Sequence, residues 1–252
     1  HLPRRAAGDD AVDGKLIYRT RLPVRIWHWI NALSIFVMLM SGMMILNAHP
    51  RLYWGKYGAN PDKAWLELPK FPGYDDPFPP LVTIPSSYDL AAAREWHFFF
   101  AWVLAIGIVL FLVYALVSRH LARDLWLSRE ERAPAHLWHD IKQHARLRFP
   151  TGEAARSYNP LQKIAYLGVV LVLIPLVILT GLTMSPTMNA AFPFLLDLFG
   201  GRQSARSIHF LCAAGLALFI AVHLLMVLLA GPVNELRSMV TGWYRLPQEK
   251  QP

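Results

Sequence analysis

Cysteine is almost absent from this sequence. The 252 residues include one cysteine, Cys212, so a disulfide within the chain is excluded. A cysteine-ligated iron–sulfur cluster and a haem attached through a CxxCH motif are excluded as well, because each needs at least two cysteines.

Charged residues are also scarce, at 17% of the chain, and the positive ones are in excess. The formal net charge is +8, a value that would suit a nucleic-acid partner. The basic residues cluster, however, in residues 1–24 and in the segment 118–160, which flank long apolar runs. This is the positive-inside pattern of membrane proteins. We therefore expect a lipid membrane and no nucleic acid as the partner, with both termini and the segment 118–160 in the cytoplasm.

Long apolar runs, by contrast, are abundant. Hydrophobic residues make up 54% of the sequence, and the mean hydropathy is +0.30. Four runs can cross the roughly 30 Å of hydrocarbon in a bilayer as helices, at about residues 25–47, 94–117, 161–184 and 206–230. The sequence predicts a single domain, residues 1–252, that is an all-α integral membrane four-helix bundle.

Four histidines lie inside these runs, although polar side chains are costly at membrane depth and mark functional sites there. Because the spans alternate in direction, His97 and His209 lie near the outer ends of their spans. His28 and His223 lie nearer the inner ends. A lone histidine of this kind is more often a core residue hydrogen-bonded to a neighbouring helix. Two pairs at two depths favour a functional interpretation.

The spacing within the fourth span indicates which function. Fourteen residues separate His209 from His223, a rotation of about 1400°, which puts both on one helix face about 21 Å apart. Haem iron takes axial imidazoles from opposite sides, and a bundle interior supplies facing helices. A single zinc ion would need its ligands gathered at one depth. We predict two bis-histidine haems, one held by the pair His97/His209 and one by the pair His28/His223.

Arginines and glycines recur at fixed positions around these histidines. Arg25, Arg94 and Arg206 each stand three residues before a proposed ligand, where a guanidinium could meet a haem propionate. Interfacial anchoring is the alternative. Gly42 and Gly181 lie at the depth of the outer pair, where a missing side chain makes room for a flat macrocycle. Close helix packing through small residues would explain the glycines equally well.

The segment between the first two runs, residues 48–93, is rich in Trp, Tyr, Phe and Pro. Its composition is not that of a disordered segment. One interpretation is an aromatic belt at the membrane interface. The other is an ordered cap that docks a partner on the outer side.

Three stretches of the chain resemble a known family. They are RLPVRIWHWINALSIFVMLMSG, SYNPLQKIAYLGVVLVLIPLVILTG and the fourth span with its tail, which ends in LRSMVTGWY. All three are similar to the bacterial cytochrome b561 and nickel–iron hydrogenase b-type cytochrome superfamily. HPRLYWGKYG, after the first span, and the closing MVTGWY resemble most the thiosulfate reductase cytochrome b subunits.

The resemblance implies a multi-pass subunit of the bacterial cytoplasmic (inner) membrane with two b haems. Such subunits transfer electrons between a periplasmic catalytic redox subunit and the quinone pool, with quinone as a diffusible substrate near the inner haem. The branch favours a molybdopterin oxidoreductase as the partner over a hydrogenase. No catalytic residues are expected in the chain itself. Its quinone-reactive site would include Arg25, Trp29 and His120, which lie near the depth of the inner haem.

Three alternatives stay open at this point. The chain would serve as the cytochrome b subunit of a nickel–iron hydrogenase, or as a stand-alone b561-type quinone oxidoreductase that resembles the superoxide oxidases. A transporter or structural anchor that uses the histidines as a polar relay is the third. The long aromatic segment disfavours the stand-alone enzyme, and no inverted repeat supports a transporter.

Overall fold

The computed structural model describes residues 14–119, 126–127 and 160–246. The chain forms two compact units, each assembled from separate stretches. Unit 1 comprises His1–Trp27, Val113–Tyr166 and Ala221–Pro252. Unit 2 comprises His28–Leu112 and Leu167–Ile220. His120, a predicted quinone-site residue, lies outside the described residues.

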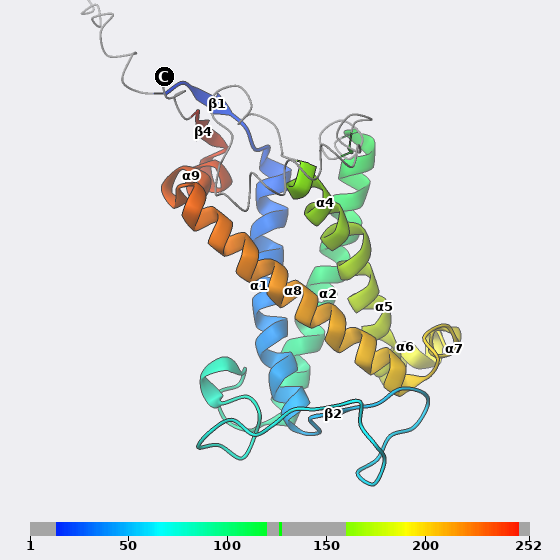
Figure 1. The fold of residues 1–252 in the computed structure, drawn as a ribbon. Helices are drawn as coiled ribbons and strands as arrows, with labels where there is room; N and C mark the ends of the chain where they lie inside the picture. Colours follow the sequence, from blue (N-terminus) through cyan, green and yellow to red (C-terminus); the bar gives the residue numbers. More distant parts are fainter. Residues whose placement is uncertain (1–13, 120–125, 128–159, 247–252) are drawn as a thin grey trace, which may run out of the picture. The chain divides into compact units, whose positions relative to one another are not determined.

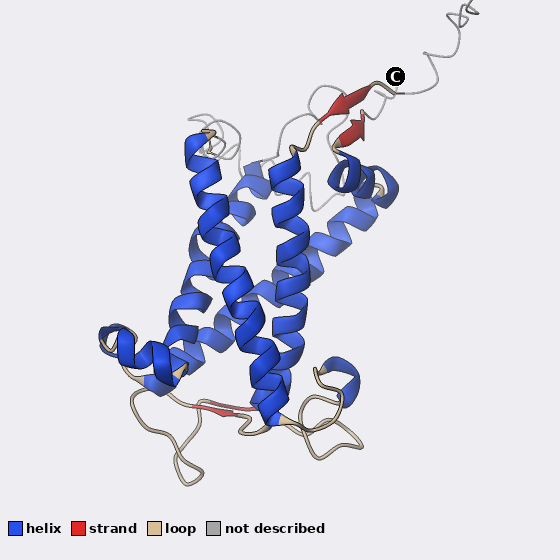
Figure 2. Cartoon of the chain, turned by 180° about the vertical axis from the view of Figure 1, so that it is seen from behind, coloured by secondary structure: helices blue, strands red, loops and turns tan. Residues whose placement is uncertain are grey.

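Long apolar helices dominate the described chain (Figure 2). They are α1 (Leu22–Asn47), α2 (Leu90–Val117), the third span and α8 (Arg202–Ala230), and each is long and apolar enough to cross a membrane. The predicted all-α membrane fold is therefore confirmed. The helices end where the apolar runs end, but α2 and α8 begin four residues earlier. In α8 the added turn carries Arg202, a charged residue that hydropathy alone does not assign to a span, whereas in α2 it is Leu90 and three alanines.

The third span is divided into three segments: α4 (Pro160–Gly168), a π-helical turn η4 (Val169–Leu173) and α5 (Ile174–Met184). Pro175 lies in the first turn of α5, where it has no backbone N–H to donate and its ring crowds the preceding turn. The wider π turn before it carries an Ile174 N–H···O=C Val169 bond, five residues apart. Such a local rearrangement lets a proline sit within a membrane helix.

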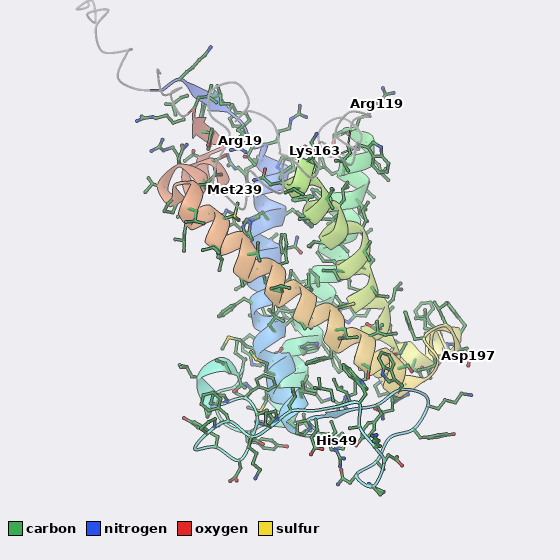
Figure 3. The ribbon with its side chains drawn as sticks, in the orientation of Figure 1. Arg19, His49, Arg119, Lys163, Asp197 and Met239 are labelled. Atoms are coloured by element: carbon green, nitrogen blue, oxygen red, sulfur yellow. The ribbon has the colours of Figure 1, made fainter. Side chains whose placement is uncertain are left out.

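Unit 1 contains a small sheet beside a short helix. β1 (Leu16–Tyr18) pairs antiparallel with β4 (Trp243–Arg245), and α9 (Pro232–Thr241) precedes β4. The glycines on either side of α9, Gly231 and Gly242, have φ of 106° and 88°, a left-handed conformation that side chains disfavour. Arg19 and Met239, labelled in Figure 3, belong to this unit, and the Arg19 guanidinium lies 4.4 Å from the centroid of the Tyr244 ring.

In unit 2, the segment after α1 folds against the beginning of α8 (Figure 1). β2 (Arg51–Leu52) pairs antiparallel with β3 (Leu66–Glu67), and the 3-10 turn η1 (Pro80–Val82) follows. The Gly55 carbonyl accepts the N–H groups of Gln203 and Ser204, while the Ser204 hydroxyl accepts the Gly55 N–H at 2.7 Å. The short helices α6 (Pro186–Ala191) and α7 (Phe194–Leu198) connect α5 to α8.

Hydroxyl side chains are part of the core of unit 2. Leu104 and Ile174 are buried there, but so are Ser41, Thr180 and Ser207, whose exposed fraction is 0%. A polar group in a membrane-spanning core must find a partner inside the protein. The buried hydroxyls therefore identify positions where the core makes polar contacts in addition to apolar packing.

Candidate functional site

Two of the four predicted histidines meet inside unit 2. His97 comes from the first turns of α2 and His209 from the first turns of α8. Their ring centroids are 6.2 Å apart, and the ring planes are inclined at 56°. The structure thus places the two histidines of the predicted outer pair side by side.

A hydroxyl group lies beside each of these rings. The Ser41 Oγ of α1 is 3.0 Å from His97 Nδ1. The Thr180 Oγ1 of α5 is 3.1 Å from His209 Nδ1. Two pairs of helices therefore present the same arrangement, in which one helix carries the histidine and its neighbour carries a buried hydroxyl.

A glycine follows each hydroxyl residue and lies against the same ring. A Cβ atom at Gly42 would be 3.4 Å from His97 Cε1, and one at Gly181 would be 3.3 Å from His209 Cε1. At these distances a methyl group is in contact with the imidazole, and any larger side chain would take its place. The room that both glycines leave is therefore occupied by the Cε1–Nδ1 edges of the histidines.

This donor set fits a haem. Two imidazoles that bind one metal ion from opposite sides, each at about 2 Å, would have ring centroids about 6 Å apart, and the observed separation is 6.2 Å. Two neutral imidazoles are the axial ligands of many b-type cytochromes. Within the residues that the structure describes, no group of three or more His, Cys, Asp or Glu side chains is placed to hold a metal ion.

The predicted arginines lie in different surroundings. The Arg206 guanidinium donates to the backbone carbonyls of Arg51, at 2.8 Å, and of His49. It ties the segment after α1 to α8, one turn from His209. Arg94 is exposed, and its guanidinium carbon is 5.8 Å from the centroid of the Phe98 ring. A role of either arginine toward a haem propionate stays a prediction.

The predicted inner residues belong to two units, so their pairing stays a prediction from depth and spacing. His28 of α1 is in unit 2, where its ring lies edge-on to Trp29 with centroids 5.0 Å apart. His223 of α8 and Arg25 of α1 are in unit 1. Trp29, which we predict at the quinone site, is 42% exposed.

The aromatic segment reaches the helix that carries His209. The Trp65 indole N–H donates to Ser207 Oγ at 2.9 Å, and that hydroxyl donates to the Tyr53 carbonyl at 2.6 Å. Trp54 stacks on Trp65 with centroids 5.6 Å apart and planes inclined at 25°. This segment is therefore folded and bonded to α8 only two residues before His209.

His49, which follows α1, lies in the same region of unit 2 (Figure 3). Its ring stacks on Tyr53, with Nε2 3.3 Å from the Tyr53 hydroxyl. Burial lowers the pKa of His49 below its ordinary 6.5, and the positive charges of Arg206 and Arg51 lower that pKa further. A neutral imidazole is therefore the favoured form in the folded protein.

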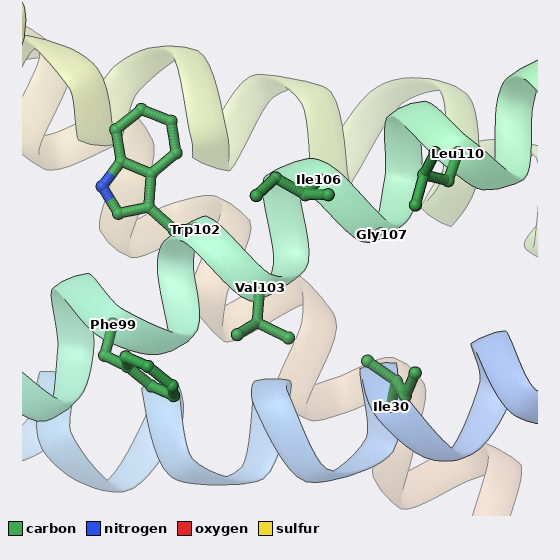
Figure 4. Close-up of a pocket in the computed structure, with 7 residues that line it drawn as sticks. All are labelled: Ile30, Phe99, Trp102, Val103, Ile106, Gly107 and Leu110. Carbon is green, nitrogen blue, oxygen red and sulfur yellow. The ribbon is translucent and has the colours of Figure 1, made fainter.

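A shallow apolar groove of 430 Å³ lies elsewhere in unit 2 (Figure 4). Ile30 of α1 lines it together with residues of α2: Phe99, Trp102, Val103, Ile106, Gly107 and Leu110. Small-molecule sites usually include a few polar groups that orient the ligand. The lining side chains offer only the Trp102 indole N–H, so the groove has little to orient a ligand.

Sequence reasoning identified Gly42 and Gly181 but missed the hydroxyl residues beside them. Ser41 and Thr180 each stand directly before one of these glycines. The repeated dipeptide, a small hydroxyl residue followed by glycine at the depth of the outer histidines, was the available signal. Serine and threonine are common in membrane helices, so the dipeptide alone does not distinguish these two residues from others.

Comparison with known proteins identifies the family of the chain. The sequence model of a family described as prokaryotic cytochrome b561 matches residues 19–242. The chain is 29% identical to a protein named as a protein-methionine-sulfoxide reductase subunit, YedZ1, of Azospira oryzae, over 90% of this chain and 98% of that one. No solved structure matches.

Other relatives have different names. A protein of Azotobacter vinelandii, named as a Ni/Fe-hydrogenase B-type cytochrome subunit, is 27% identical over 90% of this chain and 88% of its own length. A cytochrome of Escherichia coli, YdhU, is 28% identical over 92% of this chain and 76% of its own length. The predicted closeness to thiosulfate reductase subunits stays a prediction.

Proposed function

The chain belongs to the prokaryotic cytochrome b561 family, and on this premise we propose that it carries electrons through two haems b between an outer redox subunit and quinone. The coarser function follows from the family and the four apolar helices. The protein is a multi-pass inner-membrane b-type cytochrome that binds haem b and transfers electrons as a subunit alongside a catalytic redox partner. The haem number, the ligands, the quinone and the partner's chemistry are the proposed parts.

The observation that carries the proposal is the pair His97 and His209. Their centroid separation of 6.2 Å suits two axial imidazoles on one iron, and helices on either side hold both rings by hydroxyls and glycines. When bound there, haem b would supply a one-electron redox couple. The chain itself would supply ligation and an apolar surrounding, which set the reduction potential.

His28 and His223 are the proposed ligands of the second haem. The support comes from the sequence: both lie toward the inner ends of their spans, and His223 shares a helix face with His209. Two haems at two depths would divide the membrane thickness into short electron-transfer steps. Quinone would react at the inner haem, where Arg25, Trp29 and His120 are the proposed contacts.

The outer partner is proposed to be a molybdopterin oxidoreductase, with a hydrogenase as the alternative. The quoted relatives include one named as a methionine-sulfoxide reductase subunit and one named as a hydrogenase cytochrome subunit, so both classes of partner are represented. The folded aromatic segment bonded to α8 supports a docking role over that of a stand-alone quinone oxidoreductase. Isolation of the complex from the native membrane in mild detergent identifies the partner. Quinone reductase activity from this chain alone would instead favour the stand-alone enzyme.

Haem counting tests the proposed number. The purified complete chain should contain two low-spin haems b per polypeptide, measured as the pyridine haemochrome against protein. His223→Ala should reduce this count to one, because the inner iron loses a ligand. His144→Ala, which changes a histidine outside the spans predicted from the sequence, is the matched control and should keep two. One haem in the unaltered chain, or two in His223→Ala, would refute the proposed ligation.

A further inference from the structure

We propose that Ser41 and Thr180 are positioning residues for the outer haem: their hydroxyls accept the Nδ1 protons of His97 and His209 and so present Nε2 of each ring to iron. This inference rests on the proposed function, since it assumes that these histidines are axial ligands. Both residues act by orienting the histidine ligands, and neither is proposed to touch the haem.

The direction of the hydrogen bonds follows from where the hydroxyl protons go. Ser41 Oγ donates to the Val37 carbonyl at 2.8 Å. Thr180 Oγ1 donates to the Leu176 carbonyl at 2.8 Å. A hydroxyl carries one proton but two lone pairs. Because each hydroxyl donates its proton to the carbonyl of the preceding turn, it can only accept a hydrogen bond from the imidazole.

The tautomer of each histidine follows from this assignment of the hydroxyl protons. A neutral imidazole has one nitrogen that donates and one that accepts. Since Nδ1 faces an acceptor at 3.0 Å in His97 and 3.1 Å in His209, the proton belongs on Nδ1. The lone pair of Nε2 is left for a metal. A hydrogen bond from the far nitrogen is the usual means by which proteins orient a ligating histidine.

The surroundings hold this contact in place. Ser41 and Thr180 have an exposed fraction of 0%, so water does not compete for the hydroxyls. The bond to the preceding turn restricts the side-chain rotamer of each residue. The neighbouring glycines let the imidazole edges approach, because a Cβ at Gly42 or Gly181 would already touch the ring. Both halves of the site repeat this combination on separate helices.

The electronic consequence can be measured. A hydrogen bond from Nδ1–H makes the imidazole a more basic ligand, and a more basic ligand stabilises ferric over ferrous iron. The two hydroxyls should therefore lower the reduction potential of the outer haem. Removing one of them should raise that potential, and the change should be confined to one of the two haems.

Serine in membrane helices often donates to a carbonyl of the preceding turn without any role toward a ligand. Another serine of α1 makes such a bond and therefore serves as a control. Ser34 lies seven residues before Ser41 and is likewise fully buried, and its hydroxyl donates to the Ile30 carbonyl at 2.7 Å. Within the described part of the chain it bonds to no histidine. Ser34→Ala therefore removes the same helix bond without touching a proposed ligand.

The test is an optical redox titration of the complete chain with matched variants. Thr180→Val should raise the potential of one haem by about 59 mV, a tenfold change in the ratio of reduced to oxidised haem. Thr180→Ser, which keeps the hydroxyl, should stay close to the unaltered chain. Ser41→Ala should shift the same haem in the same direction, and Ser34→Ala should not. Electron–nuclear double resonance on the ferric chain should also lose or shift the exchangeable Nδ1 proton signal in Thr180→Val but not in Thr180→Ser.

The outcomes separate the inference from the proposed function. An unaltered chain without a two-imidazole low-spin spectrum would refute the proposed function. Two low-spin haems with equal potentials in Thr180→Val and Thr180→Ser would refute the inference alone. An equal shift in Ser34→Ala and Ser41→Ala would also refute it, because the effect would then come from the helix bond. If Thr180→Val does not assemble, the comparison of Ser41 with Ser34 decides by the same criterion.

Discussion

The two halves of the histidine site in unit 2 are built alike but anchored differently. In one half, Ser41 and Gly42 of α1 hold the ring of His97. In the other, Thr180 and Gly181 of α5 hold the ring of His209. The second half is anchored to the segment after α1 by two side chains, Ser207 and Arg206, in the turn before His209, whereas the first half meets that segment through the Met40 carbonyl, which accepts the Ile84 N–H at 3.3 Å. The hydroxyl and glycine beside each histidine, which both halves share, therefore concern ligation. The side-chain bonds to the segment after α1, in which the halves differ, concern the outer surface.

This comparison assigns different roles to groups that the sequence makes look equivalent. Arg94 and Arg206 both stand three residues before a histidine, yet Arg94 is exposed and Arg206 bonds two backbone carbonyls. A perturbation of the outer surface should therefore reach the α8 half more strongly than the α2 half.

The largest effect is expected from filling the space beside the rings. Gly181→Val and Gly42→Val should each lose the outer haem, because the added methyl groups displace an imidazole edge that already lies 3.3 or 3.4 Å from a Cβ. Overpacking of this kind costs about 1–3 kcal/mol or more. The haem-to-protein ratio of the purified chain should fall from two to one in both variants.

Gly107→Val is the matched control for that experiment. A Cβ at Gly107 would have nothing within 4 Å, and its helix, α2, is the one that carries His97. This variant should retain both haems. Loss of haem from Gly107→Val to the same extent as from Gly181→Val would show that any glycine-to-valine change disrupts the helices, and the shared feature would lose its support.

A smaller effect is expected when Arg206 is replaced. Arg206→Met removes two hydrogen bonds from a charged donor, which contribute about 1.5–3 kcal/mol each. Amide hydrogen exchange in residues 49–58 should accelerate about tenfold or more, since about 1.4 kcal/mol corresponds to a factor of ten. Arg94→Met, on the exposed side of the comparison, should leave that exchange unchanged. Equal protection in both variants would contradict the proposed anchoring.

The smallest effect is a pH dependence of the same segment. The pKa of His49 is lowered by burial and by Arg206 and Arg51, so the unfolded segment binds a proton more readily than the folded one. The stability of the fold here should therefore be complete above pH 6.5 and decline as the pH falls below it. Exchange in residues 49–58, corrected for the intrinsic rate, should rise in that range. His49→Gln should abolish the dependence, and a dependence that persists would exclude His49 as its source.

The spans and the outer histidine pair could be foreseen from the sequence for physical reasons. A helix that crosses a membrane needs about 20 predominantly apolar residues in a row, so four runs could be recognised directly. Alternating direction then gave His97 and His209 a common depth, and the structure places them 6.2 Å apart. Helical periodicity and depth within a span are read from short stretches of sequence, so both could be predicted without the structure.

Other features depend on contacts that no local pattern encodes. β1 and β4 pair across more than two hundred residues of chain. The attachment of the aromatic segment depends on Ser204 and Ser207, which look like ordinary residues at the start of a helix. The π turn before Pro175 could be suspected only as a kink. Ser41 and Thr180 acquire meaning only when a histidine from another helix is seen to face them.

The most direct test of the account is whether His97 and His209 serve one and the same haem. Redox titration of the complete chain should resolve two one-electron low-spin components. His97→Ala and His209→Ala should each eliminate the same component, identified by its potential and its spectrum, and leave the other unchanged. Loss of different components from the two variants, or retention of both components in either one, would contradict the central claim.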